Sequence, residues 1–212
     1  DDNMAMSTVS NRISKFDVTI TDETAGQPFS PMTLVAHKPE QRFWELGSPV
    51  SVGLEYIAET GNPSVWRSDL KSNANIYATW EGKGLILPSK SESFVVELDA
   101  NQLNNDARLS FAVMMGKTND GLVLMDGQAI KQLKVGETIS THLLSYDAGT
   151  ELNRETAETL GSAGFNPMRD DVTSVLTIHS GVVSKDDGLS NSALTQLERW
   201  DHSVAKVDIK RL

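Results

Sequence analysis

"SKFDVTITD", residues 14–22, alternates between apolar and polar side chains over its whole length. Phe16, Val18 and Ile20 fall on one face of an extended chain, and polar residues fall on the other. Because successive side chains of a strand point to opposite faces, this pattern predicts a half-buried β-strand. "SVAKVDIKRL", residues 203–212, alternates in the same way, so strands are predicted near both ends of the sequence.

Seven further short segments carry strand signals, because they are rich in β-branched or aromatic residues and are separated by turn residues. They are residues 32–37, 74–80, 92–99, 108–115, 121–127, 137–144 and 173–180. We therefore expect an all-β protein, an antiparallel β-sandwich of about eight strands with one or two short helices in its connections. The sequence shows no linker, so residues 13–212 are predicted to form a single domain after a flexible N-terminal segment, residues 1–12.

One segment has helical spacing instead. In "GSPVSVGLEYIAETGN", residues 47–62, Val50, Leu54 and Ile57 recur every three or four residues. Ser48 can cap a helix that has proline at its first position, and Gly61 can end it. One amphipathic helix of two to three turns is predicted here.

Composition narrows the possible partners. The 212 residues carry a formal net charge of −10. Such an acidic surface repels phosphate backbones and anionic membranes, whereas it suits cations, so we expect no nucleic-acid partner. The sequence has no Cys, which excludes thiol nucleophiles, Cys-ligated zinc and disulfides.

Two features bear on location. No run of about 18 apolar residues occurs, so no transmembrane segment is expected. The sequence begins "DDNMAMSTVS", as a mature chain does after removal of a signal peptide. We expect a protein that is secreted, periplasmic or held at the cell surface.

Common catalytic signatures are missing. There is no G-x-S-x-G elbow, H-E-x-x-H pair, Walker loop or dinucleotide fingerprint. No two of the four His residues stand at ligand spacing, and hydrogen-bonded structural roles are favoured for His142 and His179. The acid pairs at 170–171 and 186–187 do not fit an EF-hand, so solvated loops are favoured there.

Two turn segments are richer in oxygen ligands. "MMGKTNDGLVLMDG", residues 114–127, places Asn119 and Asp120 between two apolar strands. "YDAGTE", residues 146–151, places Asp147 and Glu151 around a glycine. Loops at one end of a sandwich can gather such carboxylates around a divalent cation such as calcium, which takes six to eight oxygens. On spacing alone, ordinary solvated turns are the favoured explanation of the same residues.

The segments together resemble a known family. Residues 27–62, "LSFAVMMGKTNDGLV" (109–123), "YDAGTE" and "SVAKVDIKRL" are similar to parts of the spondin N-terminal (F-spondin/mindin-like) domain family, here as a stand-alone bacterial-type member. The similarity extends over residues 13–212, and D-A-G-T-[DE] is its most specific motif.

This resemblance implies a C2-like sandwich with a Ca²⁺ ion at one end. The implied metal ligands are Asp120, the two motif acids Asp147 and Glu151, and a Glu from an earlier strand, Glu97, with Glu92 as the alternative. This sequence departs from the family pattern where Glu151 replaces Asp. It also has Gly121 where animal members have an aromatic residue.

The resemblance implies an exported, non-enzymatic, calcium-binding recognition or cell-adhesion module of the extracellular-matrix kind. We expect a monomer with an unidentified protein or glycan ligand, and calcium that stabilises loops. Two alternatives stay open. One is a metal-assisted hydrolase using Asp120, Asp147 or a nearby His. The other is an envelope-associated structural subunit that docks through its Trp residues, although packing roles are favoured for them.

Overall fold

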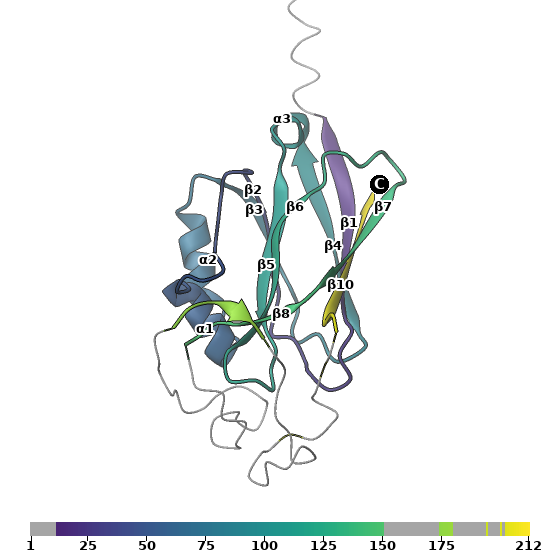
Figure 1. The fold of residues 1–212 in the computed structure, drawn as a ribbon. Helices are drawn as coiled ribbons and strands as arrows, with labels where there is room; N and C mark the ends of the chain where they lie inside the picture. The colour runs from purple at the N-terminus through teal and green to yellow at the C-terminus, as the bar shows by residue number, and fades with distance from the viewer. Residues whose placement is uncertain (1–11, 151–173, 180–193, 195–199, 201) are drawn as a thin grey trace, which may run out of the picture.

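Two antiparallel sheets pack face to face, and two helices cover the outer face of the larger sheet (Figure 1). The computed structural model describes residues 12–150, 174–179, 194, 200 and 202–212. Within them the predicted antiparallel β-sandwich is confirmed. The acid pairs at 170–171 and 186–187, Glu151 and nearly all of the N-terminal segment lie outside the described residues.

The smaller sheet contains, in spatial order, β4 (Ser91–Asp99), β1 (Ile13–Asp22), β10 (Ala205–Arg211) and β7 (Thr138–Leu143). The larger sheet contains β3 (Ile76–Glu81), β2 (Thr33–His37), β5 (Arg108–Met114), β6 (Gly121–Ala129), β8 (Ser145–Asp147) and β9 (Thr177–Ile178). The helices are α1 (Val52–Thr60), α2 (Ser64–Lys71) and α3 (Ala100–Asn104).

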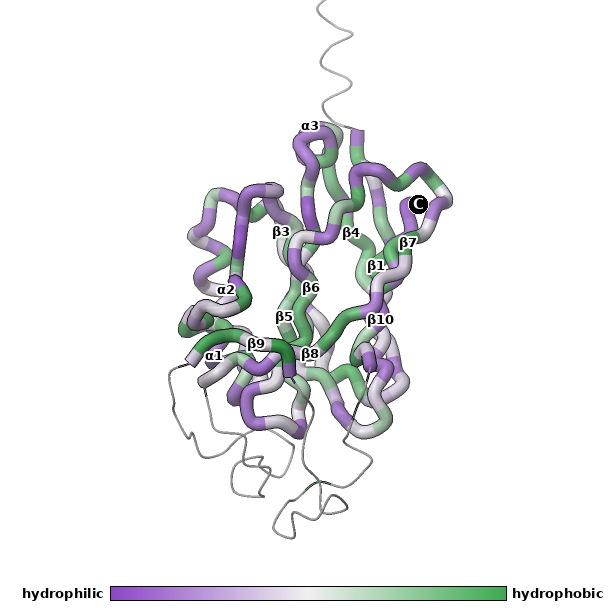
Figure 2. Tube along the Cα trace, viewed as in Figure 1, coloured by the Kyte–Doolittle hydropathy of each residue, from purple (hydrophilic) through white to green (hydrophobic). Residues whose placement is uncertain are grey.

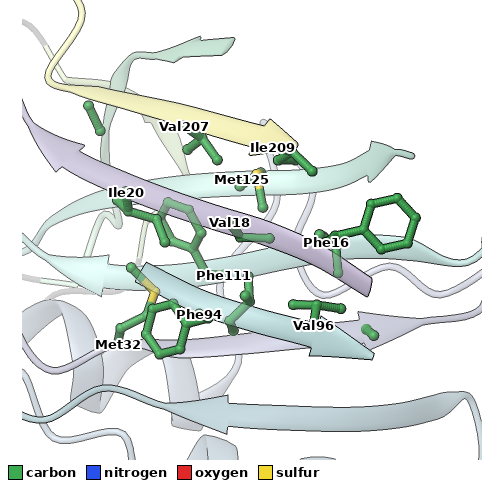
Figure 3. Close-up of a cluster of buried hydrophobic side chains, with 14 of the residues drawn as sticks. Phe16, Val18, Ile20, Met32, Phe94, Val96, Phe111, Met125, Val207 and Ile209 are labelled. Carbon is green, nitrogen blue, oxygen red and sulfur yellow. The ribbon is translucent and has the colours of Figure 1, made fainter. Parts of the chain in front are cut away.

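β1 is an interior strand of the smaller sheet, and its alternation turns one face toward the facing sheet. Val18 stands opposite Ile209 of β10 on one side and Phe94 of β4 on the other. Phe16, Val18 and Ile20 are all fully buried. Figure 3 shows these side chains gathered with residues of the facing sheet, such as Phe111 and Met125.

A second apolar layer lies on the other face of the larger sheet. There Met114 and Leu122 pack against Leu54 and Ile57 of α1 and Trp66 of α2. β2 and β5 are therefore covered on both faces, which explains their nearly continuous burial. Figure 2 shows the corresponding run of hydrophobic residues along β5.

The predicted helix exists, but its start was placed too early. Ser51, not Ser48, is the N-cap, and its hydroxyl accepts from the Leu54 N–H. Ser48 is used otherwise, because its carbonyl accepts from the Leu176 N–H. The C-terminal prediction is confirmed, since Gly61 ends α1 at φ 72°, in the left-handed region that glycine favours.

The positions of several short elements were not predicted. α2 has eight residues, α3 has five, and β8 is a three-residue strand within a turn-like segment. Of the described residues 174–179 in the predicted strand 173–180, Thr177–Ile178 form a strand. All four Trp pack against hydrophobic clusters, with Trp66 almost fully buried, as the packing interpretation predicts. Among the described residues, none of the helices has the length and apolar character needed to cross a bilayer.

Neighbouring valines on β4 test the orientation of the smaller sheet. Val96 is fully buried between the sheets, whereas Val95 is 51% exposed on the outer face. We expect Val96→Ala to lower the free energy of unfolding by about 2–3 kcal/mol, from lost burial and the cavity left behind. Val95→Ala, the matched control, lowers it by less than about 1 kcal/mol. Urea denaturation measures both, and equal losses would contradict the assigned faces.

Candidate metal centre

Two of the predicted metal ligands lie side by side at one end of the sandwich. Asp120 ends the loop between β5 and β6, and Asp147 is the last residue of β8. The antiparallel register sets Gly121 opposite Asp147, so Asp120 and Asp147 occupy adjoining positions on neighbouring strands. This end is the lower one in Figure 1, where β8 and α1 lie.

The loop that carries Asp120 is held in place by Gln27 and Pro28, in the segment after β1. The Gln27 side-chain amide makes two hydrogen bonds to Lys117, since its oxygen accepts from the Lys117 N–H and its nitrogen donates to the Lys117 carbonyl. The Gly116 N–H donates to the Pro28 carbonyl at 2.7 Å. These contacts hold the loop against the body of the protein.

Thr118 explains the glycine that departs from the family pattern. Its hydroxyl donates to the Met115 carbonyl and accepts from the Gly121 N–H. A Cβ at Gly121 would stand 2.5 Å from that hydroxyl oxygen, so a larger residue would displace Thr118. The turn is thus built around a small residue directly after Asp120.

Each residue of the D-A-G-T motif has a defined contact. The Ala148 N–H donates to the Asp120 carbonyl at 3.1 Å, and the Thr150 N–H donates to Asp120 Oδ2 at 2.9 Å. Asp147 Oδ1 accepts from the Gly149 N–H at 2.8 Å, an Asx turn. The motif therefore wraps around Asp120, and Asp147 begins this turn.

Gly149 is required by its backbone conformation and by its surroundings. Its φ is 73°, and a Cβ there would lie 2.6 Å from the Val175 carbonyl oxygen. The Gly149 carbonyl accepts from the Ser174 N–H. Residues 174–176 thus lie directly on the motif, with no room for a side chain between them.

His179 lies beside Asp147, and the sequence analysis did not place it in the site. Burial lowers the pKa of His179, and the Asp147 carboxylate acts in the opposite sense. The imidazole packs on Trp200 with ring centroids 5.0 Å apart, and the Trp200 indole N–H donates to the Ser145 hydroxyl. The one sequence feature that could have indicated this position of His179 is the predicted strand around residue 178, because a strand there can pair with β8.

The predicted ligand Glu97 and its alternative Glu92 lie elsewhere. Glu97 is exposed on the outer face of β4 and pairs with Lys15, at 3.4 Å. It stands six residues, about 20 Å of strand, from the β4 end at which Asp120 and Asp147 lie. Glu92 is nearer that end, but its carboxylate accepts from the Lys83 N–H in the β3–β4 connection. The structure does not bring either of them to the acid pair.

The described acids provide the type of ligand that a hard cation prefers, but two carboxylates are fewer ligands than calcium needs. Carboxylate oxygens are the ligands that calcium prefers, and Asp120 is fully buried. Among the described residues, no group of three or more His, Asp or Glu side chains could hold a metal ion. Glu151, the second acid of the motif, lies outside those residues.

Asp22 is a second buried carboxylate at the same end of the sandwich. It closes β1 with 0% exposure, and burial raises the pKa of its carboxyl to about 7. The Thr24 hydroxyl and N–H both donate to Asp22 Oδ1, which moderates that rise. Thr24 also bonds Gln27, so Asp22 is linked through Gln27 to the loop that carries Asp120.

The fold and this end define an antiparallel β-sandwich module with paired acids on its terminal loops. The family model described as Spondin_N matches residues 21–164, which include both loops and most of the strands. The chain belongs to the spondin N-terminal domain family. The family is one of non-enzymatic extracellular-matrix modules. No curated protein matches the sequence.

The space around Gly149 gives a direct test of the motif geometry. Gly149 and Gly136 both have positive φ, but a Cβ at Gly136 meets nothing within 4 Å. We expect Gly136→Ala to lower the free energy of unfolding by about 1–2 kcal/mol, from backbone strain alone. Gly149→Ala should lower it by at least about 2 kcal/mol more, because of the contact with Val175. Urea denaturation compares them, and equal effects would refute the close packing of residues 174–176.

Asp22 predicts a pH dependence of stability. Its pKa is about 7 in the folded protein and near 4 in the unfolded chain. Folding therefore takes up a proton between these values, so the Asp22 contribution to stability falls as the pH rises from about 4 to about 7 and is level above that. We expect Asp22→Asn to be more stable than the parent by about 2–4 kcal/mol at pH 8. Near pH 4 this advantage disappears.

Thermal melts of both proteins from pH 4 to pH 8 measure the difference. Asp17→Asn is the matched control, because Asp17 lies on the outer face of the same strand. That control should show no comparable change with pH. A constant difference between Asp22→Asn and the parent across this range would contradict the burial argument.

Proposed function

We propose that the protein is an exported recognition module of the extracellular-matrix or adhesion kind, in which Ca²⁺ stabilises the loops at one end of the sandwich. The observation that carries the proposal is the juxtaposition of Asp120 and Asp147 by the β6–β8 pairing. Two carboxylates at adjoining positions repel each other, and a divalent cation relieves that repulsion.

Asp120 and Asp147 would hold the ion together with Glu151, the second acid of the motif. The cation supplies charge neutralisation and a fixed point for the loops. Backbone hydrogen bonds already orient both carboxylates. The Thr150 N–H donates to Asp120 Oδ2, and the Gly149 N–H donates to Asp147 Oδ1. Glu151 has a side chain one methylene longer than the Asp of the family motif.

Recognition is favoured over metal-assisted hydrolysis at this site. Hydrolysis needs an open coordination position and an accessible general base near it. His179, the imidazole beside Asp147, is only 7% exposed and lies against Trp200. The non-enzymatic character of the family supports the same conclusion.

Calcium binding predicts a shift in thermal stability. Ligand at a concentration of about 100 times Kd stabilises the folded state by about 2.7 kcal/mol. For a domain of this size that corresponds to a rise of roughly 5–10 °C in Tm over chelator-treated protein. We expect Asp147→Asn to lose most of this rise, because the site loses one of its charges.

Glu97→Gln is the matched control, since Glu97 is an acid on the outer face of β4. It should keep the full calcium response, which would also remove Glu97 from the ligand set. An equal Tm with calcium and with chelator in the parent protein would refute the calcium role. A full response in Asp147→Asn would place the ion elsewhere.

A further inference from the structure

A pocket opens on the helix-covered side of the larger sheet, next to the candidate metal centre. Its volume is about 520 Å³, within the range of small-ligand sites. The buried side chains of Leu124 and Leu176 line it, together with the partly exposed rings of Trp44 and Tyr146. Tyr146 directly precedes Asp147 on β8, so the pocket and the acid pair share one strand.

The segment that carries Trp44 is fixed in place. Gly47 and Ser48 pair with Leu176, through the Gly47 N–H to the Leu176 carbonyl and the Leu176 N–H to the Ser48 carbonyl. Trp44 packs on Phe43, which meets Trp66 edge to face at 5.6 Å between ring centroids. Trp44 and Tyr146 form the aromatic wall of the pocket, and its Trp44 side is preorganised, which lowers the entropic penalty of binding.

Charged side chains of both signs line the same pocket. Arg42, Glu45 and Asp126 line the pocket and are exposed. A cationic ligand would meet Arg42, and an anionic ligand would meet the two carboxylates. A hydrocarbon would remove water from all three without replacing its hydrogen bonds. A neutral ring with several hydroxyl groups satisfies donors and acceptors together while its C–H face lies on the aromatic wall.

We infer that this pocket is a saccharide-binding site for a neutral sugar ring. Trp44 and Tyr146 provide the apolar contact, and Arg42, Glu45 and Asp126 hydrogen-bond to hydroxyl groups. The inference rests on the recognition function proposed above and names its ligand class. The sugar would not coordinate the calcium ion. Tyr146 and Asp147 are successive residues of a strand, so their side chains point to opposite faces.

Saturation-transfer NMR on the full chain with methyl glycopyranosides, followed by an array of neutral oligosaccharides and calorimetry on the best binder, tests the inference. Trp44→Ala should weaken binding by about tenfold or more, as for a buried aromatic contact. Trp80→Ala removes an indole from β3, outside the pocket lining, and should leave the affinity unchanged. Asp126→Ala changes an exposed side chain and should also weaken binding, which keeps the test valid if Trp44→Ala fails to fold.

Three outcomes would overturn the inference. They are no binding of any neutral saccharide up to about 10 mM, unchanged binding in both pocket variants, and binding only of acidic or amino sugars. Saccharide binding without any effect of calcium on Tm would refute the metal proposal alone. A calcium-dependent Tm without saccharide binding would refute the pocket alone.

Discussion

The pairing of β6 with β8 is the constraint on which the functional end of the molecule depends. Three residue pairs make up this ladder, and the last one sets Gly121 opposite Asp147. Beyond it the chain continues the contact, through the Ala148 N–H to the Asp120 carbonyl and the Thr150 N–H to the Asp120 carboxylate. If β8 left the sheet, the acid pair would separate, and the pocket wall would lose Tyr146. One short strand therefore positions both candidate sites.

So short a strand is ordered because its surroundings are rigid. β5 and β6 are packed on one face by the smaller sheet and on the other by α1 and α2, and buried backbone there must pair along the sheet. β6 consequently presents a fixed edge to β8. The same rigidity lets Asp22 stay buried with a raised pKa, since the two-sided core contributes far more free energy than one desolvated carboxylate removes.

Alternation predicted the strands that have one face toward the core, such as β1 and β10, because each side chain there reports its own face. Alternation also predicts the orientation of Glu97. Val96 and Leu98 face the core, so the residue between them faces solvent. The family resemblance suggested Glu97 as a metal ligand without taking into account which face of the strand it lies on. β8 could not be predicted in the same way, because three residues are too few for a period. The place of His179 depends in turn on the β8–β9 pairing, which no local pattern encodes.

The order of residues along β8 also determines how a cation and a sugar can influence each other. Tyr146 packs with the helix-side cluster, whereas its neighbours Ser145 and Asp147 lie toward the opposite face, where Ser145 accepts from Trp200. An ion held by Asp147 and a ring resting on Tyr146 would therefore be separated by the strand itself. Any coupling between them has to pass through the backbone position of β8, as a change in how firmly Tyr146 is held. A direct bond between the ion and sugar hydroxyl groups is inconsistent with this geometry, so the two ligands would act on one strand from opposite sides.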